Sequence, residues 1–175
     1  MAKHPVHSQE TVFKGNHIQV RVDRVMDPDG KVWSKEIVIH PGAVCVVARL
    51  DDGNVLLVRQ YRHAAGQELL EICAGGLNPG EDPAEAAIRE LEEETGYRAA
   101  KMAERARFWT TPGFTTEFMY LYEATGLVKT QINPDEDESI EVEIVTAEQA
   151  LLMIDDGRIQ DAKSILGLQR VLSRR

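Results

Sequence analysis

The chain has few of the features that mark secreted or membrane proteins. It contains two cysteines, Cys45 and Cys73, in 175 residues, which is too few for a disulfide framework and favours reduced thiols. No apolar run approaches the roughly 18 to 20 residues of a membrane span, and residues 1–10 lack the apolar core of a signal peptide. We therefore expect a cytoplasmic protein with no membrane partner.

Positive charge is also scarce. Lys and Arg number 20 against 29 Asp and Glu, which gives a formal net charge of −9. Binding to a phosphate backbone needs clustered Lys and Arg, so this balance argues against a nucleic-acid partner. A small phosphate ester could still bind if a metal ion neutralised the site.

The composition predicts one globular domain. Hydrophobic residues make up 43% of the chain and charged residues 28%, and this length allows a sufficient core. We found no internal repeat, low-complexity segment or linker.

The acidic residues concentrate in one stretch, residues 74–97, which reads AGGLNPGEDPAEAAIRELEEETGY. Asp82 is a good N-cap, Pro83 suits the first helical position, and Glu85 completes a capping-box pattern. Gly96 provides a C-terminal glycine. A glycine-rich turn therefore leads into a short, strongly acidic helix.

Helical periodicity divides that helix into faces. One narrow arc is expected to be buried, and it comprises Ala84, Ala87, Ile88, Leu91 and Thr95. Glu90, Glu93 and Glu94 share a different arc, where three carboxylates disfavour one another. A hard divalent cation such as Mg²⁺, which takes oxygen ligands, would reverse that penalty. Glu85 and Glu92 point elsewhere and read as solvated charges.

This stretch resembles the signature of the Nudix hydrolases. Nine positions agree at the family's spacing, namely Gly75, Glu81, Arg89, Glu90, Leu91, Glu93, Glu94, Gly96 and Tyr97. The resemblance implies metal-dependent hydrolysis of a nucleoside diphosphate linked to a second moiety. It also implies that Mg²⁺, with Mn²⁺ as an alternative, is held by Glu90, Glu93, Glu94 and the carbonyl of Ala74. Glu81 and Arg89 are implied to form a supporting salt bridge.

The rest of the chain predicts an α/β fold. Residues 17–25 and 32–40 alternate as an antiparallel hairpin, and residues 43–50 and 54–60 form a second, more apolar one. Further strands are expected at residues 104–110, 117–123 and 140–145, and helices at 146–154 and 162–172. The resemblance implies the Nudix α/β/α sandwich with a mixed sheet. We assign residues 1–40 to an amino-terminal β extension and residues 41–175 to the Nudix hydrolase domain.

Substrate contacts are expected from two places. Arg59 and Arg62 follow a strand and could bring positive charge to an acidic site, with Arg62 preferred. Pro112, together with Gly113 and Glu117, resembles the ADP-ribose pyrophosphatase branch of the family. In the same loop, Phe114 either stacks on a base or covers the core.

The general base is sought in the polar, acidic segment of residues 128–138. Acidic runs are usually solvated loops, but the resembling branch carries its catalytic glutamate on a loop at this position. Glu136 is the first choice and Glu138 the second. Glu93 is kept as both a metal ligand and a catalytic residue.

ADP-ribose, cleaved to AMP and ribose 5-phosphate, is the substrate we expect. A Nudix hydrolase of another sugar nucleotide such as GDP-mannose, or of a dinucleotide, is the alternative. A non-catalytic nucleotide sensor and a purely structural acidic protein fit the intact signature less well. In the resembling branch the amino-terminal extension commonly pairs with a second subunit, so we expect a homodimer; the alternative is that it packs on its own domain.

Overall fold

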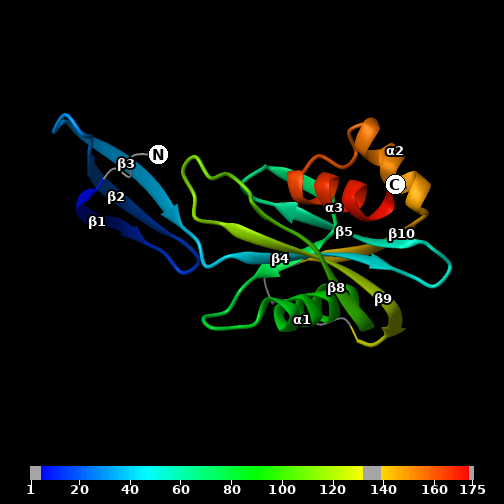
Figure 1. Cartoon of the computed structure of the whole chain (residues 1–175). Helices are drawn as coiled ribbons and strands as arrows, with labels where there is room; N and C mark the ends of the chain where they lie inside the picture. Colours follow the sequence, from blue (N-terminus) through cyan, green and yellow to red (C-terminus); the bar gives the residue numbers. More distant parts are fainter. Residues whose placement is uncertain (1–4, 132–138, 174–175) are drawn as a thin grey trace. The chain divides into compact units, whose positions relative to one another are not determined.

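The structure, a computed structural model, describes residues 5–131 and 139–173 (Figure 1). Its internal contacts divide the chain into two units. The first contains Met1–Gly42 and Trp109–Phe118, and the second contains Ala43–Phe108 and Met119–Arg175. Each unit is described by itself.

The first unit is built on a three-stranded antiparallel sheet in the order β1-β2-β3, with strands β1 (Val6–Lys14), β2 (Gln19–Met26) and β3 (Val32–Ile39). Strands β2 and β3 are the predicted hairpin. Its turn is closed by Asp27, whose Oδ1 accepts the backbone N–H of Lys31 at 2.8 Å. Strand β1 was not predicted, because it is mostly polar and exposed at every position.

The second unit contains a mixed sheet of seven strands, whose main path runs β10-β5-β4-β9-β8. Those strands are β4 (Ala43–Arg49), β5 (Val55–Arg62), β8 (Tyr97–Trp109), β9 (Phe118–Lys129) and β10 (Ile140–Val145). Strand β6 (Gln67–Glu71) pairs with β5, and β7 (Cys73–Gly76) pairs with β4. The sheet is mixed because β4 runs parallel to β9 and antiparallel to β5.

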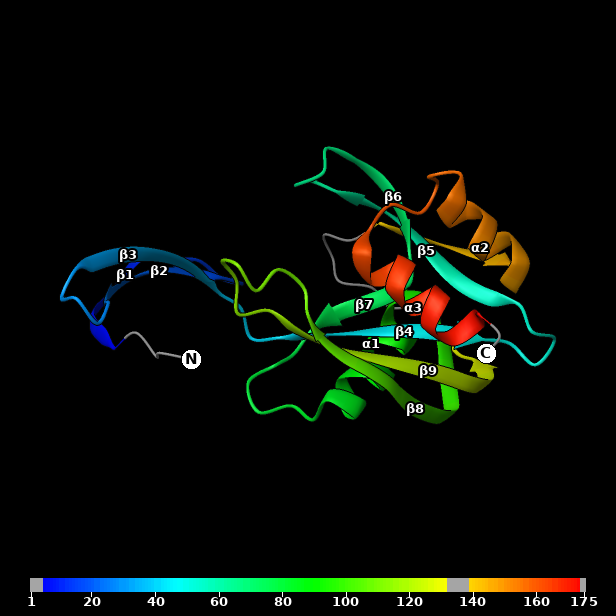
Figure 2. The same ribbon diagram turned by 45° about the horizontal axis from the view of Figure 1, so that its top comes forward.

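Helices cover both faces of this sheet (Figure 2). Helix α1 (Pro83–Thr95) lies on one face, and α2 (Ala147–Asp155) and α3 (Ala162–Leu172) lie on the other. Strand β4 separates the two cores, since its side chains alternate between them. Cys45 and Val47 pack in the core that includes Leu168 of α3, whereas Val44 and Val46 pack in the core that includes Leu91 of α1. The expected α/β/α sandwich is confirmed.

Helix α1 has the predicted ends. The side chain of Asp82 accepts the N–H of Ala84 at 2.8 Å, and Gly96 adopts the left-handed conformation at φ 67°. The predicted buried face was partly wrong. Ala86 and Glu94 are buried, whereas Ala84 and Ile88 are half-buried. Compared with the predicted buried face, the observed buried face of α1 is therefore turned slightly toward Glu94.

The other predicted elements are present with shifted bounds. Strand β8 begins at Tyr97, several residues before its predicted start. Thr146 caps α2, with Gln149 completing the capping box. Cys45 and Cys73 are free, as expected, and the structure buries both. Within the described residues, none of the helices has the length and apolar character needed to cross a membrane.

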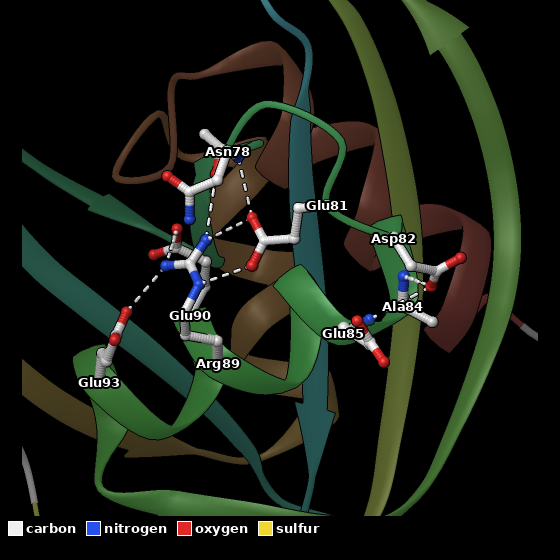
Figure 3. A network of polar contacts seen from close by, with 9 residues as sticks. Asn78, Glu81, Asp82, Ala84, Glu85, Arg89, Glu90 and Glu93 are labelled. Carbon is white, nitrogen blue, oxygen red and sulfur yellow. Dashed lines mark hydrogen bonds and ion pairs between the residues drawn. The ribbon is translucent and has the colours of Figure 1, made fainter.

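A salt bridge ties the turn before α1 to the helix itself. Arg89 donates from Nε to Glu81 Oε1 at 2.9 Å and from Nη2 to Glu81 Oε2 at 3.1 Å (Figure 3). The same carboxylate accepts the backbone N–H of Asn78 at 2.8 Å. Hydrogen bonds from Arg89 and Asn78 lower the pKa of Glu81 from its usual 4.5 to about 2. The predicted Glu81–Arg89 pair is therefore observed, and it stabilises the charged form of Glu81.

We predict that Glu81→Gln destabilises the protein at neutral pH and that this loss diminishes in acid. Because the pKa of Glu81 is depressed in the folded chain, its contribution is complete above pH 4.5 and disappears as the pH falls toward about 2. Urea unfolding of both proteins across this range measures the difference in free energy. An unchanged difference between neutral and acidic pH would contradict the prediction.

Candidate functional site

The site is formed where strand β7 meets helix α1. At Gly75, an added Cβ atom would overlap the carboxylate of Glu90. Any other residue at this position would push Glu90 away from the strand. The glycine therefore allows a carboxylate of the helix to lie directly against the backbone of the turn.

Glu94 approaches the same strand from the buried side of the helix. It is only 3% exposed, and its Oε2 accepts the backbone N–H of Ala74 at 3.1 Å. Beside it, burial raises the pKa of the Cys73 thiol well above its usual 9.0, and the carboxylates of Glu94 and Glu90 raise it further. Cys73 is thus held as a neutral thiol next to two acidic side chains.

Arg89 joins the third carboxylate of the helix, that of Glu93, to Glu90. Its Nη1 donates to Glu90 Oε1 at 2.7 Å and to Glu93 Oε2 at 2.9 Å (Figure 3). A further bond runs from Nη2 to the carbonyl of Gly76 at 3.2 Å. One guanidinium nitrogen therefore bridges Glu90 and Glu93, which offsets the repulsion that their spacing creates.

The oxygen atoms that these side chains offer are of the kind that binds a hard divalent cation. Glu90, Glu93 and Glu94 supply carboxylate oxygens beside the backbone of residues 74–75, and Mg²⁺ prefers such ligands. In the described residues, however, no three His, Cys, Asp or Glu side chains gather closely enough to hold a metal ion. In this structure Glu93 bonds Arg89, and Glu94 bonds the N–H of Ala74. Glu93 is the most exposed of the salt-bridged acids around Arg89, with 37% of its side chain accessible, and so has room to turn.

A cavity of about 560 Å³ borders this group along the outer side of α1. It is lined by Glu85, Ile88, Arg89, Glu92, Glu93, Arg98 and Gln131. Both Arg89 and Glu93 thus face a space large enough for a small molecule.

The predicted substrate arginines are both held by carboxylates. Arg59 donates from Nε to Glu143 Oε1 at 2.7 Å. Arg62 donates from Nε and Nη2 to Glu71 Oε2, at 3.1 and 2.6 Å. Glu71, the partner of Arg62, is buried, at 2% exposure.

The loop of residues 111–117 belongs to the first unit. Pro112, Gly113 and Phe114 line a cavity of about 350 Å³ together with Trp109. Phe114 is 56% exposed, so the interpretation that it covers the core was wrong. Glu117 accepts a hydrogen bond from Thr110 Oγ1 at 2.6 Å.

The predicted bases, Glu136 and Glu138, lie outside the described residues. Sequence reasoning missed Lys163, whose Nζ lies 2.9 Å from Glu71 Oε2. No local pattern could have indicated this contact, because it joins strand β6 to helix α3 across a long stretch of chain.

The chain is similar to known proteins in both sequence and fold. Residues 39–167 match the family model of the NUDIX domain. The chain is 40% identical to the ADP-ribose pyrophosphatase of Bacillus subtilis (strain 168), over 93% of this chain and 89% of that protein. It is 41% identical to the methanol dehydrogenase activator of Bacillus methanolicus, over 91% and 88% of the two chains.

Two further matches cover a shorter part of the chain or are less similar in sequence. A GDP-mannose pyrophosphatase of Yersinia pestis (strain Pestoides F) is 38% identical, over 73% of this chain and 69% of that protein. A crystal structure of an ADP compounds hydrolase shares the fold, with a TM-score of 0.87, 24% identity and coverage of 98% of this chain and 93% of that chain. The family match extends over well more than half of the chain and includes the glycine turn and the acidic helix, so this protein belongs to the NUDIX family.

Proposed function

We propose that this protein is a metal-dependent pyrophosphohydrolase whose substrate is ADP-ribose, cleaved at the diphosphate to AMP and ribose 5-phosphate. The observation that carries the proposal is the 40% identity to an ADP-ribose pyrophosphatase over nearly the whole of both chains. The close approach of Glu90 to Gly75 and the burial of Glu94 support it, because they set acidic side chains against the turn that precedes the helix.

Glu90, Glu93, Glu94 and the carbonyl of Ala74 would hold the metal ion, with Mg²⁺ preferred over Mn²⁺. When bound, such an ion supplies Lewis-acid polarisation of the phosphoryl oxygens. Arg89 keeps Glu90 and Glu93 together, and Glu81 holds Arg89 in turn. Glu136, or in its place Glu138, would remove the proton from the attacking water.

Substrate contacts are proposed for Arg62 and Arg59 and for the loop that contains Pro112, Gly113, Phe114 and Glu117. Arg62 has 34% of its side chain exposed and Arg59 35%, so neither side chain is fully buried. The exposed ring of Phe114 is suited to stacking on a base.

Two other functions are favoured by particular relatives. Similarity to a GDP-mannose pyrophosphatase supports the hydrolysis of a different sugar nucleotide. Similarity to a methanol dehydrogenase activator supports the activation of a dehydrogenase as a second candidate function. A non-catalytic sensor is less well supported, because the three signature glutamates proposed to bind metal, Glu90, Glu93 and Glu94, are all present.

A substrate panel tests the proposal. Purified protein is incubated with ADP-ribose, GDP-mannose, NADH or diadenosine polyphosphates, with Mg²⁺, with Mn²⁺ or with EDTA, and the products are separated by chromatography. We expect ADP-ribose to give AMP and ribose 5-phosphate with the highest kcat/KM, and only when metal is present. If another compound has a higher kcat/KM, it replaces ADP-ribose as the proposed substrate. If none of the compounds is hydrolysed, the proposal that the protein is an enzyme is overturned. Adding the protein to methanol dehydrogenase and measuring its turnover tests the second candidate.

Two glutamine variants provide the control for this panel. Glu94→Gln removes one proposed metal ligand and should abolish metal-dependent hydrolysis. Glu148→Gln makes the same change in the exposed first turn of α2 and should keep full activity. Equal activity of the two variants would overturn the assignment of Glu94.

The proposed base predicts a second result. Glu136→Gln should lower kcat by about 10²- to 10⁴-fold, which is the usual contribution of general-base assistance, with little change in the free energy of unfolding. Glu138→Gln should retain most of the activity. Steady-state kinetics of the two variants distinguish them, and the reverse order would transfer the role to Glu138.

We also propose that the protein is a homodimer that pairs through its amino-terminal sheet. Strand β1 is exposed along its entire length. Val6, Val12, Phe13 and Trp33 are between 47% and 54% exposed. Strand β1 is also an edge of its sheet, and exposed apolar side chains beside an open strand edge are typical of a surface that pairs with another chain.

Sedimentation equilibrium tests this proposal. We expect twice the chain mass of 19.6 kDa. Val12→Asp should give a monomer, because it places a charge on the edge strand that is proposed to pair. Val128→Asp makes the same change at a valine that is 64% exposed on β9 and should leave the dimer intact. A monomeric wild-type protein would contradict the proposal.

A further inference from the structure

Glu71, at the end of strand β6, is a buried acid that the proposed hydrolysis does not use. It is 2% exposed, yet it forms ion pairs with two cations. Its Oε2 accepts Arg62 Nη2 at 2.6 Å and lies 2.9 Å from Lys163 Nζ. A carboxylate is stable in such a place only when opposite charges compensate its lost hydration.

Lys163 is itself held at the start of helix α3. Its Nζ donates to Asp161 Oδ2 at 2.9 Å, and the same oxygen caps the helix by accepting the N–H of Ser164 at 3.0 Å. Only 14% of the Lys163 side chain is exposed. The charges of the four side chains therefore alternate in the order Arg62, Glu71, Lys163 and Asp161, so each cation has an acidic neighbour.

The backbone beside Glu71 is fixed by helices on both sides. Ser164 Oγ of α3 accepts the N–H of Ile72 at 2.9 Å. Two residues beyond Ile72, Glu94 of α1 accepts the N–H of Ala74, and Glu90 lies against Gly75. The start of α3 is thus linked, through a short run of strand, to the turn that carries the proposed metal site.

We propose that Glu71 and Lys163 are positioning residues that orient Arg62 toward the substrate diphosphate. This inference rests on the proposed function, in which Arg62 contacts that group. Glu71 takes both Nε and Nη2 of Arg62, which fixes the plane of the guanidinium. Lys163 supplies a second positive charge to Glu71, so the carboxylate does not depend on Arg62 alone. Without Lys163, Arg62 is drawn inward and binds the diphosphate less well.

A double-mutant cycle on the full chain tests this role. Calorimetry with ADP-ribose in EDTA measures Kd without turnover. Arg62→Met should weaken binding by about tenfold, a loss of about 1.4 kcal/mol. Lys163→Met should weaken it several-fold, and Lys163→Arg should restore it to near the wild-type value. The double variant should bind no more weakly than Arg62→Met, because Lys163 acts through Arg62.

Glu123 provides a matched control for Glu71. It is a second buried glutamate, 7% exposed, that pairs with the two cations Arg49 and Arg105. Glu71→Gln and Glu123→Gln should both lower Tm, but only Glu71→Gln should raise Kd. A purely structural role for Glu71 would leave Kd unchanged in both variants.

The outcomes separate this inference from the proposed function. If Lys163→Met binds like the wild type, or weakens binding equally with and without Arg62, the positioning role is overturned although hydrolysis stands. If the wild-type protein binds ADP-ribose and the cycle is non-additive but hydrolysis is absent, the positioning role stands and the proposed reaction falls. A wild-type protein that neither binds nor cleaves ADP-ribose overturns both.

Discussion

The guanidinium of Arg89 is the contact on which the acidic helix depends. It donates to Glu81, Glu90, Glu93 and the carbonyl of Gly76, so it neutralises charge and also joins the helix to the turn before it. Without a central cation, the carboxylates of α1 would repel one another and the turn would lose its main side-chain attachment. The same arginine would compete with the proposed metal ion for Glu90 and Glu93, so a substitution of Arg89 would change both the packing of the helix and the availability of these two carboxylates.

The two cores of the second unit pack different helices against the sheet. The core under α1 places small side chains, Ala86 and Ala87, against the sheet and lets the helix lie close to it. The opposite core contains Ala150 and Met153 of α2 and Leu168 of α3. Through Ser164 and Lys163, that second core also reaches the strand that leads into the glycine turn. Both layers of the sandwich therefore contribute to the position of residues 71–75.

Local signals in the sequence predicted the helices and most of the strands, but they missed the polar strand β1 and the long-range contacts. Asp82 and Gly96 mark the ends of α1 because capping is decided within a few residues. The pairing of Glu81 with Arg89 was likewise implied by the family spacing. By contrast, the contact between Lys163 and Glu71 depends on how α3 packs on the sheet, which no short pattern encodes. The burial of Glu94 was missed for a similar reason, since one helical arc was assumed to carry all three carboxylates equally.

The protonated state of Cys73 has a chemical consequence for the site. Only a thiolate reacts readily with oxidants and electrophiles. Burial and the adjacent acids raise the pKa of this thiol, and burial raises the pKa of Cys45 to about 12. At neutral pH the sulfur atom of Cys73 is therefore a protonated thiol, because burial and the negative charges of Glu94 and Glu90 disfavour the thiolate.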